Sequence, residues 1–250
     1  MGCTDSHTGI TDEEATLRSQ ESALFFSNQT VTANYLALCR YSRGQELNAE
    51  AFDQALTKML VIKGNLGSSG ANTDFYESFR KPSGLYDAKL MKVLCVLLGS
   101  GSPSEKATLL FETYDPAFEL RLSRAKIAEM AEDLVDVSAK KTAVLVTDAQ
   151  FRHSGQLTNQ QYLKGLCTQA GSAQDAFQQL VLRGEDSVSK QDFVGILPQP
   201  ENCGWLSSSG IRKLLGIFNS KRLVVRKHEK VSLTGNRPVL RKPDATPSAS

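Results

Sequence analysis

The sequence contains no long apolar run and no strong excess of charge of one sign. In 250 residues, 29 Lys and Arg nearly balance 27 Asp and Glu, which argues against a strongly basic nucleic-acid binder. No apolar run approaches the ~20 residues that a membrane-spanning helix needs, and we expect no secretory signal after Met1. These absences predict no membrane span and no nucleic-acid partner. The length of 250 residues predicts one folded domain or two small ones.

Cysteine and histidine are few and scattered. The five cysteines form no CxxC pair, and the three histidines have no metal-ligand spacing with one another or with a cysteine. This pattern favours reduced thiols over a disulfide framework. The GxSxG, HExxH and protein-kinase signatures are absent, and the glycine-rich stretch 99–106 lacks the GK of a phosphate-binding loop. The sequence therefore predicts no catalytic residues, no metal ligands and no enzyme activity.

The amino terminus matches a signal for lipid attachment. Gly2 and Ser6 match the M-G-x-x-x-[ST] pattern of N-myristoylation, and Cys3 stands beside Gly2. A single myristoyl chain binds membranes only marginally, with an association constant near ~10⁴ M⁻¹, so stable residence needs a second signal. The following TDSHTGITDEE holds no Lys or Arg, which leaves a palmitoyl group on Cys3 as that signal. We expect acylation of Gly2 and Cys3, and a location at the cytoplasmic face of a membrane.

Basic residues gather near the other end of the chain. Residues 212–242 hold ten Lys or Arg and one acidic residue, which leaves nineteen basic and twenty-six acidic residues elsewhere. Apolar residues with helical spacing precede and overlap this basic tail, namely Ile211, Leu214, Leu215 and Phe218. The basic residues singled out are Arg212, Lys213, Lys221, Arg222, Arg226 and Lys227.

Three interpretations of this segment stay open. It is a helix that packs against the protein itself, a basic amphipathic segment that binds anionic lipid, or an element that binds a protein partner. The final RKPDATPSAS is rich in Pro and Ser and is predicted to be disordered.

Five stretches share one pattern, in which an apolar residue precedes a helix-capping residue, three variable positions and a large apolar residue. They are LNAEAF (47–52), LYDAKL (85–90), LSRAKI (122–127), LTNQQY (157–162) and VSKQDF (188–193), and their first residues are spaced by 38, 37, 35 and 31. Such spacing indicates a repeated unit. Helical periodicity follows the stretches, with expected N-caps at Asn48, Ser123, Thr158 and Ser189. Ser102 and Glu105, with Pro103 between them, predict a capping box before a further helix.

This layout resembles the EF-hand over roughly residues 20–198. In the EF-hand loop, D-x-[DN]-x-[DN]-G-x₅-E, the apolar residue is position 8 and the cap is position 9. KATLLFETYDPAFELRLSRAKIAEMAEDL and DAFQQLVLRGEDSVSKQDFVGIL are similar to the third and fourth hands of neuronal calcium sensors and calcineurin-B-like proteins. The MG start together with LSRAKIAEMAEDLV is also similar to the EF-hand part of TLDc-domain proteins.

The resemblance implies an all-α fold of helix–loop–helix pairs with short β-contacts between loops. We expect an acylated segment at 1–18, a first EF-hand-like pair at 19–98 and a second EF-hand-like region at 102–198. An amphipathic helix and the basic, partly disordered tail would follow at 199–250. The 157–162 stretch is either a hand or an insertion between hands.

The residues that bind calcium in an EF-hand are missing here. Ca²⁺ needs six to eight oxygens, including a bidentate Glu at position 12, and the loop needs a sharp turn at position 6. Only the fourth unit keeps glycine at position 6, as Gly155, and the third offers Asp115 and Glu119 at most. Counted from each position 8, position 12 is Ala51, Lys89, Lys126, Gln161 and Asp192. We predict a scaffold that folds without metal, with no cofactor and no calcium site of physiological affinity.

The leading hypothesis is a membrane-anchored, calcium-insensitive adaptor in signalling. EF-hand pairs bind a partner's amphipathic helix in a hydrophobic groove, and the expected groove residues are Phe52, Leu94, Phe111 and Met130. One alternative, implied by the resemblance to calcineurin-B-like proteins, is a regulatory subunit of a phosphatase or kinase. Another is a calcium sensor with non-standard ligands, namely Asp115, Glu119 and Asp192.

Overall fold

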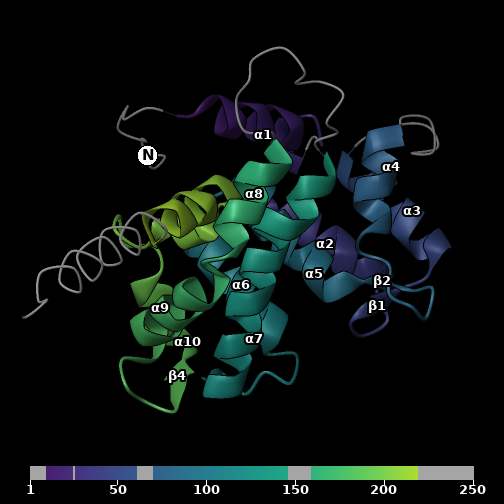
Figure 1. Ribbon diagram of the computed structural model, residues 1–250. Coiled ribbons are helices and arrows are strands. Elements are labelled where there is room, and N and C mark those ends of the chain that lie inside the picture. Colours follow the sequence, from purple (N-terminus) through teal and green to yellow (C-terminus); the bar gives the residue numbers. More distant parts are fainter. Residues whose placement is uncertain (1–9, 25, 61–69, 146–158, 219–250) are drawn as a thin grey trace, which may run out of the picture.

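The computed structural model describes residues 10–24, 26–60, 70–145 and 159–218. These residues are mostly helical, with two small antiparallel sheets (Figure 1). In this described part of the chain, no helix is long and apolar enough to cross a membrane. The expected mainly helical fold is therefore confirmed.

Among the residues described, the first half of the chain contains five α-helices and one small sheet. Its elements are α1 (Asp12–Ser22), α2 (Val31–Tyr41), β1 (Glu46–Leu47), α3 (Ala49–Leu60), α4 (Gly70–Glu77), β2 (Tyr86–Asp87) and α5 (Ala88–Leu98), with a short 3-10 turn, η1 (Phe26–Asn28). Helix α1 continues past residue 18, where the sequence suggested that the N-terminal segment ends.

The second half repeats this alternation of helices and short strands. Its elements are α6 (Pro103–Tyr114), β3 (Arg121–Ser123), α7 (Arg124–Val135), the π-helix η3 (Asp136–Lys141), η4 (Thr142–Leu145), α8 (Asn159–Cys167), α9 (Ala170–Leu182), β4 (Ser187–Ser189), α10 (Lys190–Ile196) and η6 (Cys203–Leu206). Residues 208–218 are helical as well and are called the C-terminal helix below.

Helices begin where short polar side chains can accept the first free backbone N–H groups. Ser102 accepts from Glu105 N at 3.2 Å, and the Glu105 carboxylate accepts from Ser102 N at 2.9 Å, with Pro103 in the first turn. The predicted capping box is thus confirmed. The expected caps at Asn48, Ser123 and Ser189 are confirmed too, whereas Thr158 lies outside the described residues.

The two sheets join loops that lie far apart in the sequence. In one, Leu47 pairs with Tyr86, and in the other Leu122 pairs with Val188. The predicted β-contacts between loops are therefore present. The second unit was misaligned by one residue, because Tyr86 rather than Leu85 pairs with Leu47.

One hydrophobic cluster runs through both halves. Helix α5 packs on α6, and α7 packs on α9. Aromatic contacts extend this cluster from the loops to the C-terminal region, with ring centroids 5.5 Å apart for Phe111 and Phe193 and 4.9 Å apart for Phe177 and Trp205. The helices that flank the loops thus share one core.

Candidate functional site

The loops between paired helices are the places where an EF-hand would hold calcium. Four such loops lie within the described residues, between α2 and α3, α4 and α5, α6 and α7, and α9 and α10. The sheets join the first to the second and the third to the fourth. The fourth sequence unit, with Gly155, has its loop outside the described residues.

The loop after α6 is closed by its own carboxylate. Asp115 is buried, and its Oδ1 and Oδ2 accept from Glu119 N and Leu120 N, each at 2.8 Å. Leu120 stands at position 6 and has φ +58°, while Phe118 has φ +57°. The turn that glycine usually makes is therefore kept by a leucine, at a conformational cost. Both Asp115 oxygens accept backbone N–H groups, so this carboxylate helps to fix the shape of the loop.

Position 12 of this loop carries a positive charge. Lys126 follows the Ser123 cap, and its Nζ lies 2.9 Å from Glu129 Oε2. An ammonium where calcium needs a bidentate carboxylate repels a divalent ion. Glu119, the other expected oxygen donor, is exposed.

The loop before α5 has a different register from the one expected. With Tyr86 at position 8, position 9 is Asp87, whose side chain accepts from Leu90 N at 3.0 Å and caps α5. Position 12 is then Leu90 instead of Lys89, and position 6 is Gly84, with φ +83°. The expectation that only Gly155 keeps the turn glycine was therefore wrong. Counted as an EF-hand loop, the loop before α5 has glycine at the turn but an apolar side chain where such a loop has its glutamate.

Lys89 belongs to a charged cluster between α5 and α7. Its Nζ lies 2.6 Å from both Glu129 Oε1 and Asp133 Oδ2, and Tyr114 donates to Asp133 at 2.7 Å. Burial alone would lower the pKa of Lys89, but its bonds to Asp133 and Glu129 outweigh burial and raise that pKa. Burial is the main cause that raises the pKa of Asp133, and it also raises that of Tyr114 well above its usual value. Lys89 thus acts as a half-buried structural cation that joins α5 to α7.

The loop after α9 is tied to its partner loop by protein groups. The Arg124 guanidinium lies 3.2 Å from Asp186 Oδ1 and donates to Glu185 O at 2.9 Å. At position 12, Asp192 accepts from the Ser189 hydroxyl at 2.5 Å. Ser189 in turn accepts from Asp192 N at 3.1 Å, so this carboxylate belongs to a helix cap.

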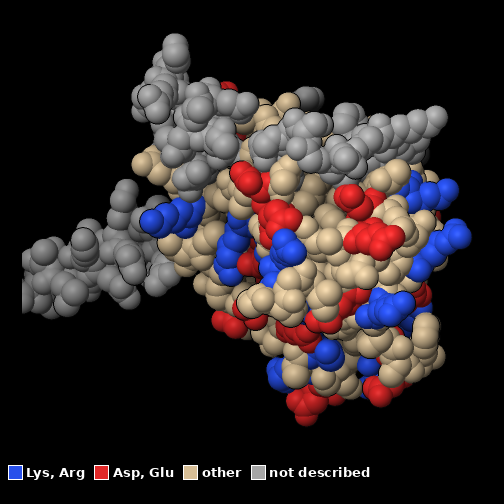
Figure 2. Space-filling view, turned by 90° about the vertical axis from the view of Figure 1, so that its right-hand side faces the viewer, with Lys and Arg blue, Asp and Glu red and all other residues tan. Residues whose placement is uncertain are grey.

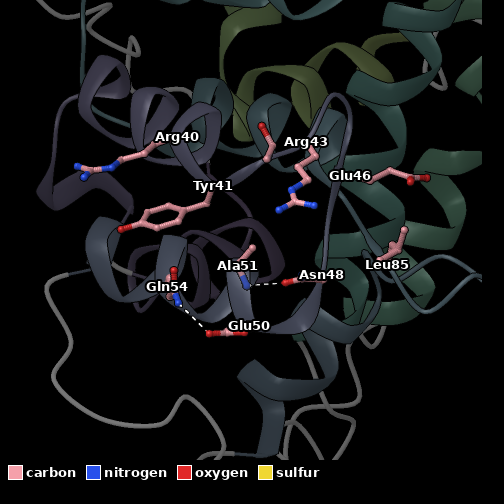
Figure 3. A pocket seen from close by; sticks show the side chains of 10 residues that line it. Arg40, Tyr41, Arg43, Glu46, Asn48, Glu50, Ala51, Gln54 and Leu85 are labelled. Atoms are coloured by element: carbon pink, nitrogen blue, oxygen red, sulfur yellow. Dashed lines mark hydrogen bonds between the residues drawn. The ribbon is translucent and has the colours of Figure 1, made fainter.

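The loop after α2 borders a pocket of about 630 Å³ (Figure 3). Arg43 points into the space between the helices, while Glu46 extends away from it. Asn48 Oδ1 accepts a hydrogen bond from Ala51 N at 2.8 Å. The side-chain oxygen at position 9 therefore caps α3. The pocket is lined by Arg40, Tyr41, Ser42, Arg43, Glu46, Asn48, Glu50, Ala51, Gln54 and Leu85. The count that puts Leu47 at position 8 puts Arg40 at position 1, so a cation again stands where calcium needs an acid.

The described residues contain no group of three or more His, Cys, Asp and Glu side chains that could hold a metal ion. Asp115, Glu119 and Asp192, expected as non-standard ligands, do not come together. Asp115 follows α6, whereas Asp192 lies in the first turn of α10, and they make the separate bonds given above. A site built from these three side chains finds no geometric support in these loops.

The expected groove residues do not line an open surface in this conformation. Phe52, Leu94, Phe111 and Met130 are between 0 and 5 % exposed and belong to the core. Phe52 stacks on Tyr86 with centroids 3.9 Å apart, and Phe111 meets Phe193 of α10. The aromatic residues that cover Phe52 and Phe111 lie far away in the sequence. The apolar periodicity of one helix does not identify such contacts.

Arg212 is not a surface residue of a basic tail, and that expectation was wrong. It is 0 % exposed and lies between Glu14 and Glu21 of α1. Its Nε and Nη2 donate to Glu14 at 2.8 and 2.9 Å, and its Nη1 and Nη2 donate to Glu21 at 2.7 and 3.0 Å. Nη1 also donates to Ser138 O at 3.0 Å and to Ser208 Oγ at 2.7 Å.

This network is called the Arg212 clamp below, and it comprises Arg212, Glu14, Glu21, Ser138 and Ser208. The bonds to Glu21 and Glu14 outweigh burial and raise the pKa of Arg212. Every N–H of the guanidinium therefore has an acceptor, as a buried charge requires. Ile211 and Leu215 beside it are fully buried, so the C-terminal helix packs against the protein itself.

Other expected site residues divide into two groups. Lys213 is exposed on the C-terminal helix. Gly2, Cys3, Lys221, Arg222, Arg226 and Lys227 lie outside the described residues.

Two features of the site were missed in the sequence. Asp87 was readable as a cap, since aspartate is among the best N-cap residues, but the repeat was aligned on Leu85. The Arg212 clamp left no such local signal, because its members are up to 198 residues apart.

Comparisons with known proteins add no relative. No family model matches the chain, and the comparison with curated proteins gives no match either. Support for a function therefore comes from the loops, the Arg212 clamp and the chain ends.

Proposed function

We propose that this protein is a lipid-anchored adaptor of the EF-hand type that does not respond to calcium. The observation that carries the proposal is the absence of a bidentate glutamate at position 12 of the described loops, and the bonds of Asp115 add to it. The two oxygens of Asp115 accept backbone N–H groups of its own loop, so protein groups already orient this carboxylate. Lys126 and Leu90 at position 12 point the same way, since neither can chelate an ion.

The pairing of loops supports an EF-hand type of architecture. Two sheets of two or three residues join helix–loop–helix units, and each unit is capped at position 9. A scaffold of this kind persists without metal because caps, strand pairs and core contacts replace the ion. Such a protein would be able to bind its partner whether or not calcium is present.

The lipid anchor is proposed from the first residues of the chain. Gly2 and Cys3 are the acyl sites, and two acyl chains would give the stable membrane residence that one chain does not. The chain would then sit at the cytoplasmic face of a membrane and hold its partner there.

Partner binding is proposed as a protein–protein contact. Because Phe52, Leu94, Phe111 and Met130 are buried, a partner helix could reach them only after the core opens. A pull-down from cells with the full chain tests this contact. Recovery of a phosphatase or kinase at near-equal stoichiometry would identify a regulatory subunit of an enzyme, and recovery of no partner would contradict the adaptor.

The anchor is tested by intact mass of the protein from eukaryotic cells, before and after hydroxylamine. We expect a myristoyl increment that resists hydroxylamine and a palmitoyl increment that is lost. In cell fractionation, Gly2→Ala should move to the cytosol and Cys3→Ser should be only partly retained on membranes. The anchor is wrong if the protein carries neither increment, or if Gly2→Ala stays on membranes.

A further inference from the structure

The pocket after α2 has a volume that suits a ligand. Its volume of about 630 Å³ lies within the roughly 300–1,000 Å³ of typical binding pockets. The end of α2, the turn that follows it, the start of α3 and Leu85 form its walls. Backbone bonds hold this turn, since Arg43 N donates to Glu46 O at 3.0 Å. Gln45 O also accepts from Ala88 N at 3.0 Å. The wall that carries Arg43 is therefore preorganised.

Two arginines at this pocket have no acidic partner in the described part of the chain. Arg40 and Arg43 are exposed, and no carboxylate among the described residues lies within ion-pair distance of either. Arg80 and Arg124, by contrast, each pair with an acid. The Arg40 guanidinium lies 6.0 Å from the ring centroid of Tyr41, at the edge of the range for a cation–π contact. Because a guanidinium can bind a carboxylate through two parallel N–H donors, both arginines can take up an acidic ligand.

The acidic residues at the pocket leave a positive balance. Glu46 extends away from the space (Figure 3), and its Oε1 lies 3.2 Å from Lys81 Nζ. Glu50 lies across the space from Arg43 and accepts a hydrogen bond from Gln54 Nε2 at 3.3 Å. Two guanidinium groups thus accompany one carboxylate that has no cation partner among the described residues. This balance favours a negatively charged ligand.

The two guanidinium groups are spread along the surface instead of converging on one point. In Figure 3, Arg43 points into the space between the helices, whereas Arg40 extends away from it alongside Tyr41. Leu36 lies one turn before Arg40 on α2 and is 60 % exposed. An apolar contact and two separated cations therefore follow one another along this surface. This spread suits an extended acidic segment better than a single small anion.

The wider surface supports a short polypeptide segment as the ligand. Figure 2 shows the side of the molecule that lies at the right of Figure 1, where α3 and β1 are labelled. Acidic and basic residues intermingle on this face. Nucleic acids and anionic bilayers are held by an extended field of positive charge, whereas a peptide is recognised through a few paired charges and apolar contacts. The charge pattern therefore favours a polypeptide partner.

We infer that the surface formed by Leu36, Arg40, Tyr41 and Arg43, called the Arg43 surface below, binds an acidic segment of a partner polypeptide. In that segment, carboxylates for the two arginines flank an apolar side chain for Leu36 and Tyr41. The inference rests on the proposed function and deepens it, because it names the chemistry of the adaptor's partner. It also gives the partner a place to dock on the folded protein without opening the core.

The test measures peptide binding to the purified full chain by fluorescence anisotropy. The probe is a fluorescein-labelled peptide of alternating glutamate and leucine, and the matched peptide has glutamine in place of every glutamate. We expect the acidic peptide to bind at least about tenfold more tightly, because a carboxylate paired with a guanidinium adds hydrogen bonds between charged groups. Equal binding of the two peptides, or binding of neither, would overturn the inference. Complete displacement by inorganic phosphate would overturn it too, because the site would then recognise a single small anion.

Substitutions of opposite expected effect locate the site. Arg43→Gln should weaken binding of the acidic peptide about tenfold, and Arg40→Gln should weaken it severalfold. Glu50→Gln should strengthen it about two- to fivefold, because a competing carboxylate is removed. Arg121→Gln is the matched control, since Arg121 is an exposed arginine in β3 of the other sheet, and it should change nothing. Circular dichroism should show all four variants folded. Equal effects of Arg121→Gln and Arg43→Gln, or weaker binding by Glu50→Gln, would overturn the assignment of the site.

The outcomes separate this inference from the proposed function. A pull-down with the full chain compares the wild type with a double variant, Arg40→Gln and Arg43→Gln. If both recover the same partner equally, the adaptor stands and the Arg43 surface is not its docking site. If the purified protein binds the acidic peptide through Arg43 but cells yield no partner, the adaptor is wrong and the binding site stands. Loss of the partner only in the double variant, together with peptide binding, supports both.

Discussion

Arg212 and Lys89 each lie between two carboxylates, yet they hold different parts of the molecule. Arg212 is 0 % exposed and joins helices almost two hundred residues apart, whereas Lys89 is 12 % exposed and joins α5 to α7. The planar guanidinium of Arg212 donates six hydrogen bonds, whereas the ammonium of Lys89 forms ion pairs with two carboxylates. The comparison shows that Arg212 joins the C-terminal helix to α1, whereas Lys89 joins α5 to α7.

The largest effect is expected from Arg212→Met. This change leaves Glu14 and Glu21 buried without their cation, so the free energy of unfolding should fall by about 3–5 kcal/mol. Urea unfolding measures it, with Arg124→Met as a control. Arg124 pairs with Asp186 on the surface, and its loss should cost about 1 kcal/mol or less.

The clamp also predicts a rescue. Adding Glu14→Gln and Glu21→Gln to Arg212→Met should recover part of the lost stability, because the buried charges are then gone. A loss below 1 kcal/mol for Arg212→Met, or a triple variant less stable than the single one, would contradict the clamp.

Lys89→Met should have a smaller effect, about 2 kcal/mol. Glu129 keeps its contact with Lys126, and Asp133 keeps the hydrogen bond from Tyr114. Both carboxylates are also closer to solvent than those of the clamp. The same unfolding assay ranks the two clusters, and a Lys89 variant less stable than the Arg212 variant would reverse the comparison.

Alkaline pH should weaken the Lys89 cluster before the clamp. The pKa values of Lys89 and Tyr114 are raised in the folded protein, so above about pH 10 the unfolded chain binds fewer protons and stability falls as pH rises. Burial also raises the pKa of Tyr35 to about 12. Arg212 stays charged across this range. The unfolding midpoint should therefore fall less steeply between neutral and alkaline pH in Lys89→Met than in the wild type, and identical slopes would argue against this cluster.

The smallest effect is expected in a loop outside both clusters. Leu120→Gly should stabilise the protein by about 0.5–1 kcal/mol, because glycine adopts φ +58° without strain. Leu120 is 54 % exposed, so little burial is lost. Thermal unfolding measures the gain, with Leu120→Ala as a control that keeps the strain. A destabilised glycine variant would show that the leucine side chain itself supports the loop.

Local chemistry made much of the fold predictable from the sequence. Ser102 and Glu105, and the caps at Ser123 and Ser189, follow from neighbours within four residues, so periodicity and capping placed their helices correctly. The two loop sheets followed from the repeat. The error at Leu85 arose because two adjacent apolar residues both fit the pattern, and the cap at Asp87 decides between them.

The tertiary contacts could not be predicted in this way. From its helical spacing, Phe111 is equally compatible with an exposed groove and with a buried core. Only its contact with Phe193 shows that it is buried. Arg212 reads as a tail residue until the two glutamates of α1 are known to lie beside it. Both depend on which distant helices meet, and a single helix pattern does not contain that information.

The claim that the loops need no calcium is tested most directly by calorimetric titration of the metal-free full chain with Ca²⁺. The bonds of Asp115 and the side chains at position 12 predict no binding heat, and the same unfolding temperature in Ca²⁺ and in EGTA. Micromolar binding, or an unfolding temperature that rises with Ca²⁺, would contradict the account and make the protein a calcium sensor with unusual ligands.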